Sequence, residues 1–191
     1  MIRYEDLYNE VKEILSEKRF KHSEGVVKRA IEYAKIYNVD IETTKLVAIS
    51  HDIAKELSEQ ENKKYIDEYG IKLDDIEKKN HNLLHAKIGS YICKNKYGFT
   101  EEMTNAVRFH TTGRENMSIL EQIIYTADAT EPGRNYPSTY YVDLVKKDIN
   151  QGVFEICKWV SERLLERNEV VHLDTIKCYN YYNNLAYEKS N

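Results

Sequence analysis

The scarcity of residues that break helices constrains the fold of this chain more than any other feature. Among 191 residues there are seven glycines and two prolines, and the prolines, Pro132 and Pro137, lie in one short stretch. Long segments can therefore continue as helices without interruption. Hydrophobic residues make up 41% of the chain and charged residues 31%, which is typical of a globular protein. We expect a single all-α domain.

Apolar residues recur at helical spacing in successive segments, which short polar stretches separate. We expect residues 18–22 to interrupt the first helix, and Asp40 or Thr43 to cap the third. Residues 58–80 are polar and predict one or two short helices on the outside. The other expected helices span residues 2–18, about 23–37, about 43–55, 81–97, 100–110, 118–129, 139–149 and 151–168.

Charge and cysteine usage exclude several classes of function. The formal net charge is -4 and the short lysine clusters have acidic neighbours, so we expect no nucleic-acid partner. No apolar run reaches transmembrane length and no signal peptide is recognisable, so we expect a cytoplasmic protein without a membrane partner. Neither a zinc knuckle nor a disulfide framework is indicated, because no CxxC pair occurs among the three cysteines, Cys93, Cys157 and Cys178.

A histidine and an aspartate, His51 and Asp52, stand side by side in the apolar run 46–55. An ionised carboxylate is costly to bury unless it is paired or binds a metal ion. The adjacent imidazole supplies a second donor for such an ion. This stretch therefore predicts a buried cation and directs the search for further ligands.

Four more residues of the same chemical types lie on apolar helix faces: His22, His85, His110 and Asp128. Any one of them alone is more often a satisfied polar residue of the core than a ligand. All six groups are satisfied at once if they converge on a cation, whereas burying each one separately would be costly. We interpret the pattern as a metal site.

These residues fall in motifs that resemble the YqeK family of HD-domain metal-dependent phosphohydrolases, whose signature is H…HD…D. The motifs occupy residues 19–26, 51–55, 84–86, 110–114 and 128–134, in the family's order and over nearly the whole chain. The resemblance implies an HD-domain helical bundle over residues 1–191, with a C-terminal aromatic tail (169–191) packing near the site. It also implies symmetrical hydrolysis of diadenosine tetraphosphate to two ADP by metal-activated water.

Small departures from the family's pattern occur in two motifs. Ala129 and Thr130 stand where the family commonly has tyrosine and isoleucine, and Leu84 replaces an aromatic residue before His85. Neither departure affects an expected ligand. They bear on how a nucleoside packs rather than on metal binding.

The resemblance assigns the primary metal ion to two imidazoles and two carboxylates, those of His22, His51, Asp52 and Asp128. Asp52 would bridge to a second ion held by His85 and His110, and these three residues are the expected catalytic residues. Without a second ion the same two histidines would contact phosphate or move a proton. This donor set suits iron, with manganese or another divalent ion as alternatives, and one or two ions.

Cationic and aromatic residues near these motifs are candidates for binding the nucleotide. Arginine binds phosphate bidentately, and the candidates for phosphate contact are Arg19, Lys55, Arg114, Arg134, Thr111, His85 and His110. The alternative for the arginines is an ordinary salt bridge. Tyr179 or Tyr181 could stack on adenine while Asn180 bonds its edge; the alternative is that the tail only packs on the core.

Two other functions stay open from the residues alone. One is a phosphohydrolase for mononucleotides or another signalling nucleotide, because metal ligands recognise only the phosphate. The other is a helical regulatory module whose metal is structural. The expected partners are a nucleotide substrate and its ADP product, and the resemblance also implies a homodimer.

Overall fold

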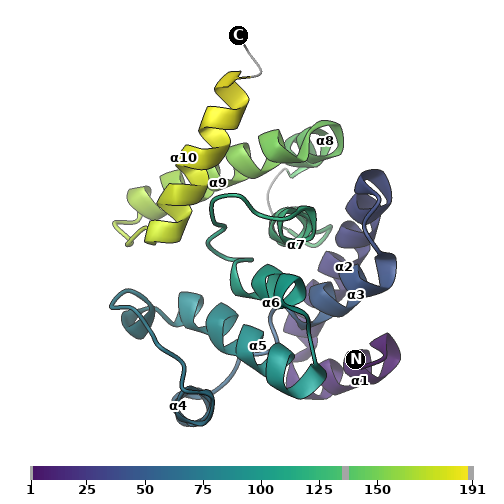
Figure 1. The fold of residues 1–191 in the computed structure, drawn as a ribbon, viewed down its shortest axis with the longest axis vertical. Coiled ribbons are helices and arrows are strands. Elements are labelled where there is room, and N and C mark those ends of the chain that lie inside the picture. Colours follow the sequence, from purple (N-terminus) through teal and green to yellow (C-terminus); the bar gives the residue numbers. More distant parts are fainter. Residues whose placement is uncertain (1, 135–137, 189–191) are drawn as a thin grey trace.

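The computed structural model describes residues 2–134 and 138–188, and every regular element in these ranges is a helix. The fold is therefore all-α, as the sequence predicts (Figure 1). The elements are α1 (Tyr4–Ile14), α2 (Glu17–Tyr37), α3 (Ile41–Ser50), α4 (Glu59–Tyr69), the 3-10 turn η1 (Glu77–Lys79), α5 (His81–Tyr97), α6 (Glu101–Arg108), α7 (Ile119–Thr130), α8 (Thr139–Lys147), α9 (Ile149–Glu166) and α10 (Leu173–Glu188).

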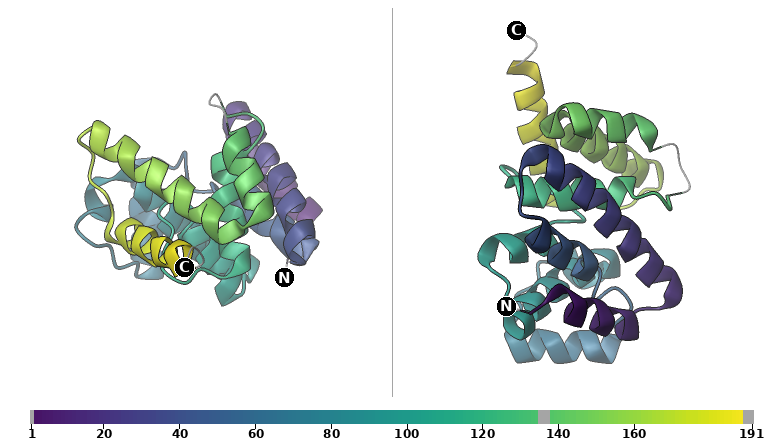
Figure 2. Two further views of the ribbon diagram at one scale, coloured as in Figure 1. Left: turned by 90° about the horizontal axis from the view of Figure 1, so that it is seen from above. Right: turned by 90° about the vertical axis from the view of Figure 1, so that its right-hand side faces the viewer.

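Helix α7 lies at the centre of the bundle and packs against α2, α3, α6, α8 and α9. Helices α2, α3 and α6 surround it on one side, whereas α8, α9 and α10 form a group on the other side (Figures 1 and 2). Helix α4 lies at the periphery against α5. No helix within the described ranges combines the length and apolarity that a bilayer span requires.

The break between α1 and α2 falls at Leu15–Ser16, so the prediction of an interruption at 18–22 was wrong. Ser16 caps α2 by accepting a hydrogen bond from the Arg19 N–H, and Glu56 accepts bonds from both the main-chain N–H and the hydroxyl of Ser16, each at 2.7 Å. The capping serine was the signal that apolar spacing alone did not reveal. As a result Arg19 and His22 lie in the first turns of α2.

Polar caps begin the other helices that carry site residues. Asp40, one of the two expected candidates, caps α3 by accepting from the Thr43 N–H at 2.7 Å. Ser118 begins α7 in a capping box with Glu121, in which each side chain accepts from the other residue's main chain. These caps fix where the helices begin and therefore which side chains face inward.

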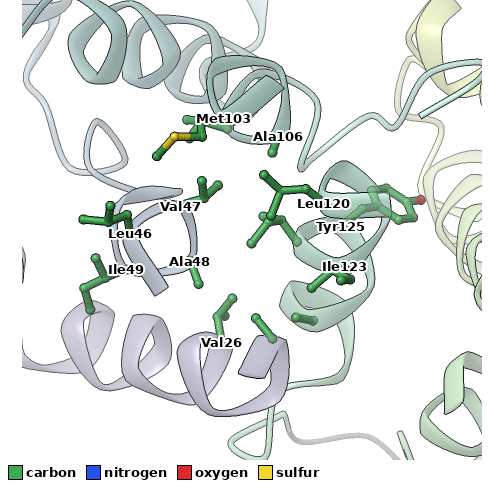
Figure 3. Close-up of a cluster of buried hydrophobic side chains, with 14 of the residues drawn as sticks. Val26, Leu46, Val47, Ala48, Ile49, Met103, Ala106, Leu120, Ile123 and Tyr125 are labelled. Atoms are coloured by element: carbon green, nitrogen blue, oxygen red, sulfur yellow. The ribbon is translucent and has the colours of Figure 1, made fainter. Parts of the chain in front are cut away.

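Apolar side chains from α2, α3, α6 and α7 meet on the inner faces of these helices, in a hydrophobic core that also extends to α1, α5, α9 and α10 (Figure 3). Burying one large aliphatic side chain stabilises a fold by about 1.5–3 kcal/mol. The helices that carry the predicted ligands are thus held together by ordinary hydrophobic packing. Members of this cluster include Val26, Leu46, Val47, Ala48, Ile49, Met103, Ala106, Leu120, Ile123 and Tyr125.

The predicted aromatic tail is largely helix α10, which packs along α9. Tyr179 contacts Phe154 of α9, with the ring centroids 5.5 Å apart. The buried hydroxyl of Tyr182 accepts a hydrogen bond from the Met117 N–H at 3.1 Å. The C-terminal helix therefore stabilises α9 and the connection that leads from α6 to α7.

Candidate metal centre

Five segments of the chain bring the six predicted ligands together in the interior. His22 comes from α2, His51 and Asp52 from the end of α3, His85 from α5, His110 from just after α6, and Asp128 from α7. His51, Asp52, His85 and His110 are at most 3% exposed, whereas His22 and Asp128 are only partly buried. The cluster therefore has a closed inner side and one side near the surface.

Asp52 is the centre of the cluster, because each of its carboxylate oxygens faces a pair of imidazoles. Oδ2 lies 3.5 Å from Nε2 of His51 and 3.8 Å from Nε2 of His22. Oδ1 lies 3.0 Å from Nε2 of His85 and 3.6 Å from Nε2 of His110. A carboxylate with donors grouped at both oxygens has the geometry of a bridging ligand.

The remaining aspartate joins the cluster on the His22 side, where Asp128 Oδ1 lies 3.1 Å from His22 Nε2. In this cluster the donor atoms form two groups of three, and within each group all three atoms lie within 4.8 Å of one another. His51 belongs to both groups. The first group is His22, His51 and Asp128, and the second is His51, Asp52 and His110.

Hydrogen bonds at Nδ1 fix which nitrogen of three imidazoles faces the cluster with a lone pair. Nδ1 of His51 lies 2.7 Å from the Ala48 carbonyl and Nδ1 of His110 lies 2.8 Å from the Val107 carbonyl. A carbonyl only accepts, so Nδ1 carries the proton in both rings and Nε2 is left with its lone pair. Nδ1 of His22 likewise donates to a carboxylate, which is described below.

The donor set fits a divalent metal ion. Nε2 of His22 and Nε2 of His51 are buried without a hydrogen-bond partner among the described residues. Both atoms point their lone pairs at carboxylate oxygens, an arrangement that is repulsive unless a cation lies between them. Imidazoles that donate through one ring nitrogen and bind metal through the other are the usual arrangement in protein metal sites.

Protonation states in the cluster also suit a metal. Burial opposes ionisation of Asp52, but the surrounding histidines, His51 foremost, hold its pKa well below the usual range. Burial also opposes ionisation of Asp128, but the neighbouring His22 and the Arg134 charge lower its pKa. Burial lowers the pKa of His85 to about 4, so this ring is neutral at physiological pH. Deprotonated carboxylates and neutral imidazoles are the forms that bind metal.

His85 differs from the other three histidines in which ring nitrogen carries the proton. Its Nδ1 lies 3.4 Å from Nζ of Lys55, and an ammonium group can only donate. The proton of the neutral ring is then on Nε2, which donates to Asp52 Oδ1 at 3.0 Å. His85 can bind a second ion only after this proton has moved to Nδ1, so it functions as a hydrogen-bond donor in the present arrangement.

Two of the predicted phosphate-binding cations contact the aspartates of the cluster. Arg19 Nη1 lies 2.8 Å from Asp52 Oδ2. Arg134 donates from Nε to the Asp128 carbonyl at 2.9 Å and forms an ion pair with the Asp128 carboxylate. Both side chains are partly exposed, so their remaining donors can reach a ligand from solvent. Lys55 is largely buried beside His85, and burial lowers its pKa.

Other predicted nucleotide contacts lie in different surroundings. Thr111 Oγ1 is 3.1 Å from Nε2 of His110, which places it at the edge of the cluster. The Arg114 guanidinium forms two 2.7 Å bonds with the buried Glu121 carboxylate, so it stabilises the turn before α7. That is the salt-bridge alternative for this arginine.

The aromatic candidates are on α10. Tyr179 faces Phe154 of α9, and Tyr181 donates from its hydroxyl to Asn116 at 3.1 Å. Asn180 is exposed. A stacking role for these residues stays a prediction.

One residue of the site, Glu131, was not singled out from the sequence. Its Oε1 lies 3.2 Å from His22 Nδ1, and its Oε2 accepts a hydrogen bond from the Gly133 N–H. A Cβ at Gly25 would lie 3.2 Å from Glu131 Cδ and well inside van der Waals contact with Oε2. Gly25 is thus the available signal, because a glycine inside a helix usually has a packing reason.

The departures from the family's motifs lie outside the ligand cluster. Thr130 is buried and exchanges a 2.8 Å hydrogen bond with the hydroxyl of Tyr33 in α2. Leu84 faces a surface pocket between α4 and α5 that also includes Ile66 and Leu73. Both residues have packing roles in this chain.

A second group of metal-type side chains, Asp74, Glu77 and His172, has a structural explanation. Nδ1 of His172 accepts from the Asp174 N–H at 3.1 Å, so Nε2 carries the proton and donates to Asp74 at 2.9 Å. No imidazole lone pair is then available for an ion. The buried Glu77 carboxylate forms ion pairs with Lys87 and Arg108.

Comparisons with known proteins agree with this geometry. The sequence model of the HD domain matches residues 19–133. The chain is 38% identical over 172 residues to "Bis(5'-nucleosyl)-tetraphosphatase, symmetrical" of Halalkalibacterium halodurans, an alignment that covers 89% of this chain and 91% of that protein. It is 35% identical to the protein of the same name from Bacillus subtilis, with 90% and 92% covered.

A solved structure is similar over almost the full length. The crystal structure of a "predicted HD superfamily hydrolase involved in NAD metabolism" from Clostridium acetobutylicum superposes with a TM-score of 0.90 at 34% identity. The match covers 96% of this chain and 98% of that protein. With the H…HD…D residues gathered around Asp52, these similarities lead to one assignment: the chain belongs to the HD-domain proteins and, among them, to the YqeK family.

Proposed function

We propose that this protein is a metal-dependent hydrolase that cleaves diadenosine tetraphosphate symmetrically into two ADP. The observation that carries the proposal is the convergence of four imidazoles on Asp52, with Arg19 at its Oδ2 and Lys55 on the far side of His85. Relatives named symmetrical bis(5'-nucleosyl)-tetraphosphatase, at 35–38% identity over about nine-tenths of the chain, support the same reaction.

The reaction adds one water molecule across the central phosphoanhydride bond. The water oxygen forms a bond to one of the two middle phosphorus atoms, and the bond from that phosphorus to the central bridging oxygen breaks. The bridging oxygen leaves with the electron pair as a terminal phosphate oxygen of one ADP, and the water's proton is released. A divalent metal in this site would polarise the phosphate and make water more acidic.

The chain's own residues bind the phosphates and hold protons. Arg19 and Arg134 already contact carboxylate oxygens of the cluster, and a guanidinium binds phosphate oxygens with the same fork of donors. Lys55 adds a cation beside His85. Nε2 of neutral His85 carries a proton 3.0 Å from Asp52 Oδ1, and we expect this proton to be donated to the leaving oxygen. His110 presents the lone pair of its Nε2 3.6 Å from the same carboxylate oxygen, where it can accept a proton.

We propose iron as the resident metal, with manganese as the alternative. Imidazole and carboxylate donors without thiolate suit these ions. Elemental analysis of protein purified without added metal decides the identity and the number of ions. One ion per chain agrees with the proton on His85 Nε2, and two ions would require that proton to move.

The cytoplasm is the proposed location, because all three cysteines are free thiols and reducing conditions keep them so. A homodimer also stays a prediction. The exposed apolar side chains near the turn between α9 and α10, Leu165, Val170, Leu173 and Ile176, are the surface that a second copy would cover. Light scattering on the purified protein measures the oligomeric state.

The decisive experiment is product analysis with diadenosine tetraphosphate and mononucleotides as competing substrates. Two ADP per substrate supports the proposal, whereas preferential release of phosphate or triphosphate from mononucleotides favours the second enzyme function.

Asp52→Ala should lose at least about a thousandfold in turnover, because it removes the ligand shared by both sides of the cluster. The variant should stay helical by circular dichroism. Unfolding of Asp52→Ala would instead favour a regulatory module with a structural metal.

A further inference from the structure

Helix α10 packs against the loop that follows His110, and we propose that Cys178 and Tyr182 of this helix are positioning residues for His110. The two residues are one helical turn apart, so they lie on the same face of α10. Both are buried, Cys178 at 0% and Tyr182 at 1% exposure. The inference rests on the proposed function, because it takes His110 to act in the hydrolysis of the substrate.

A short turn after α6, rather than a helix, holds His110. The Phe109 carbonyl accepts a hydrogen bond from the Gly113 N–H at 2.8 Å, which closes this turn around His110. The imidazole is tied to the end of α6, because its Nδ1 donates to the Val107 carbonyl at 2.8 Å. The position of Nε2, which lies 3.6 Å from Asp52 Oδ1, therefore depends on where the turn lies.

Cys178 packs directly on the backbone of this turn at Gly113. A Cβ at Gly113 would lie 2.5 Å from Cys178 Sγ and 3.2 Å from Cys178 Cβ. The same Cβ would lie 3.5 Å from the ring of Tyr125 in α7, so the turn is confined between α10 and α7. Gly113 also has a φ of +64°, a backbone conformation that favours glycine. The turn cannot approach α10 more closely, and Gly113 has no side chain to fill the space if the thiol is removed.

Tyr182 fixes the other end of the same loop. Its hydroxyl accepts a hydrogen bond from the Met117 N–H at 3.1 Å. The next residue, Ser118, is the N-cap of α7, the helix that carries Asp128. One face of α10 thus holds the loop both where it leaves the His110 turn and where it enters α7.

The test is a double-mutant cycle that combines Cys178→Ala with His110→Ala and measures kcat for ADP formation from diadenosine tetraphosphate. Cys178→Ala should lower kcat about tenfold with KM nearly unchanged, because a small displacement of a catalytic group slows the reaction strongly. In the His110→Ala background the same change should have no further effect on kcat. An equal loss in both backgrounds overturns the inference, while ADP formation by the wild type still supports the proposed function. A wild-type protein that forms no ADP overturns both.

Cys157→Ala is the matched control, because it removes a buried thiol of α9 that bonds to the Thr175 carbonyl of α10 at 3.5 Å. Both cysteine variants should unfold at lower urea concentration than wild type, but only Cys178→Ala should lower kcat. A loss of kcat in Cys157→Ala as large as that in Cys178→Ala overturns the inference. Tyr182→Phe removes a single hydroxyl and should lower kcat about threefold only when His110 is present. This second cycle decides the inference if Cys178→Ala loses helicity by circular dichroism.

Discussion

Replacing Gly25 with alanine should weaken metal binding although residue 25 contacts no ligand of the cluster. The new Cβ would lie 3.2 Å from Glu131 Cδ and closer still to Oε2. Glu131 is only 4% exposed, and both of its oxygens are hydrogen-bonded, to His22 and to the Gly133 N–H. The carboxylate can therefore make room only by giving up at least one of these bonds.

Two opposing effects set the change in stability that Gly25→Ala causes. On helix propensity alone, alanine in place of glycine stabilises a helix by about 1 kcal/mol. A hydrogen bond to a charged group contributes about 1.5–3 kcal/mol, so displacing the carboxylate from His22 outweighs that gain. Loss of the residue that orients a metal-binding histidine lowers metal affinity by about 10- to 100-fold. We expect Gly25→Ala to reduce affinity within that range and to lower stability by about 1 kcal/mol.

Competition with a chelating dye measures the affinity, and urea unfolding followed at 222 nm measures the stability of the metal-free protein. Glu131→Ala provides the matched background, because it removes the atoms that the new Cβ would meet. In that background Gly25→Ala should leave affinity unchanged and should stabilise the protein. Equal affinity of Gly25→Ala and wild type, or the same loss in both backgrounds, would refute the reasoning.

Two further predictions concern ion pairs away from the metal. Arg114→Ala should lower the free energy of urea unfolding by about 2–3 kcal/mol with metal content unchanged, because it leaves the buried Glu121 carboxylate without its main partner. The control Arg163→Ala breaks an exposed ion pair and should lower that free energy by less than about 1 kcal/mol. Burial opposes ionisation of Asp74, but hydrogen bonds from the Glu77 N–H and His172 lower its pKa to about 2. The ionised form therefore stabilises the fold above about pH 4, and this contribution to stability is lost as the pH falls from about 4 to 2. Asp74→Asn should therefore be less stable than wild type at pH 6 and equal to it near pH 2, and a constant difference across this range would contradict the prediction.

The sequence predicted the helical class because the signal is local and repeated along the chain. Few breakers, apolar spacing and capping residues each act within one turn of a helix. The prediction of an interruption at residues 18–22 was wrong because apolar spacing alone did not locate the end of the first helix. Ser16 begins α2 by capping the Arg19 N–H, and the Glu56 carboxylate that binds Ser16 lies 40 positions away.

The ligand cluster was predictable for a different reason. Histidine and aspartate on an apolar helix face are costly in isolation, so each position signals a partner even when the partner is distant in the sequence. The structure brings His22, His51, Asp52, His85, His110 and Asp128 together, and their roles as metal ligands stay a prediction. The resemblance to a known family added the substrate, which the metal-binding residue types do not specify.

Residues that support the ligands leave a weaker mark in the sequence. Glu131 follows a helix, where an exposed glutamate is common, and its partners His22 and Gly25 lie more than a hundred positions earlier. A sequence pattern identifies a polar side chain on an apolar helix face, because such a group is costly to bury. A supporting group such as Glu131 lies on no such face, so its role becomes visible only when its neighbours are known. Arg114 is the converse case, since its position next to a ligand motif indicated phosphate, and the buried Glu121 carboxylate that binds it became visible only when α7 was in place. A glycine inside a helix, such as Gly25, is therefore a useful additional signal, because a neighbour in the space of its missing Cβ explains why the helix tolerates a cost of about 1 kcal/mol relative to alanine.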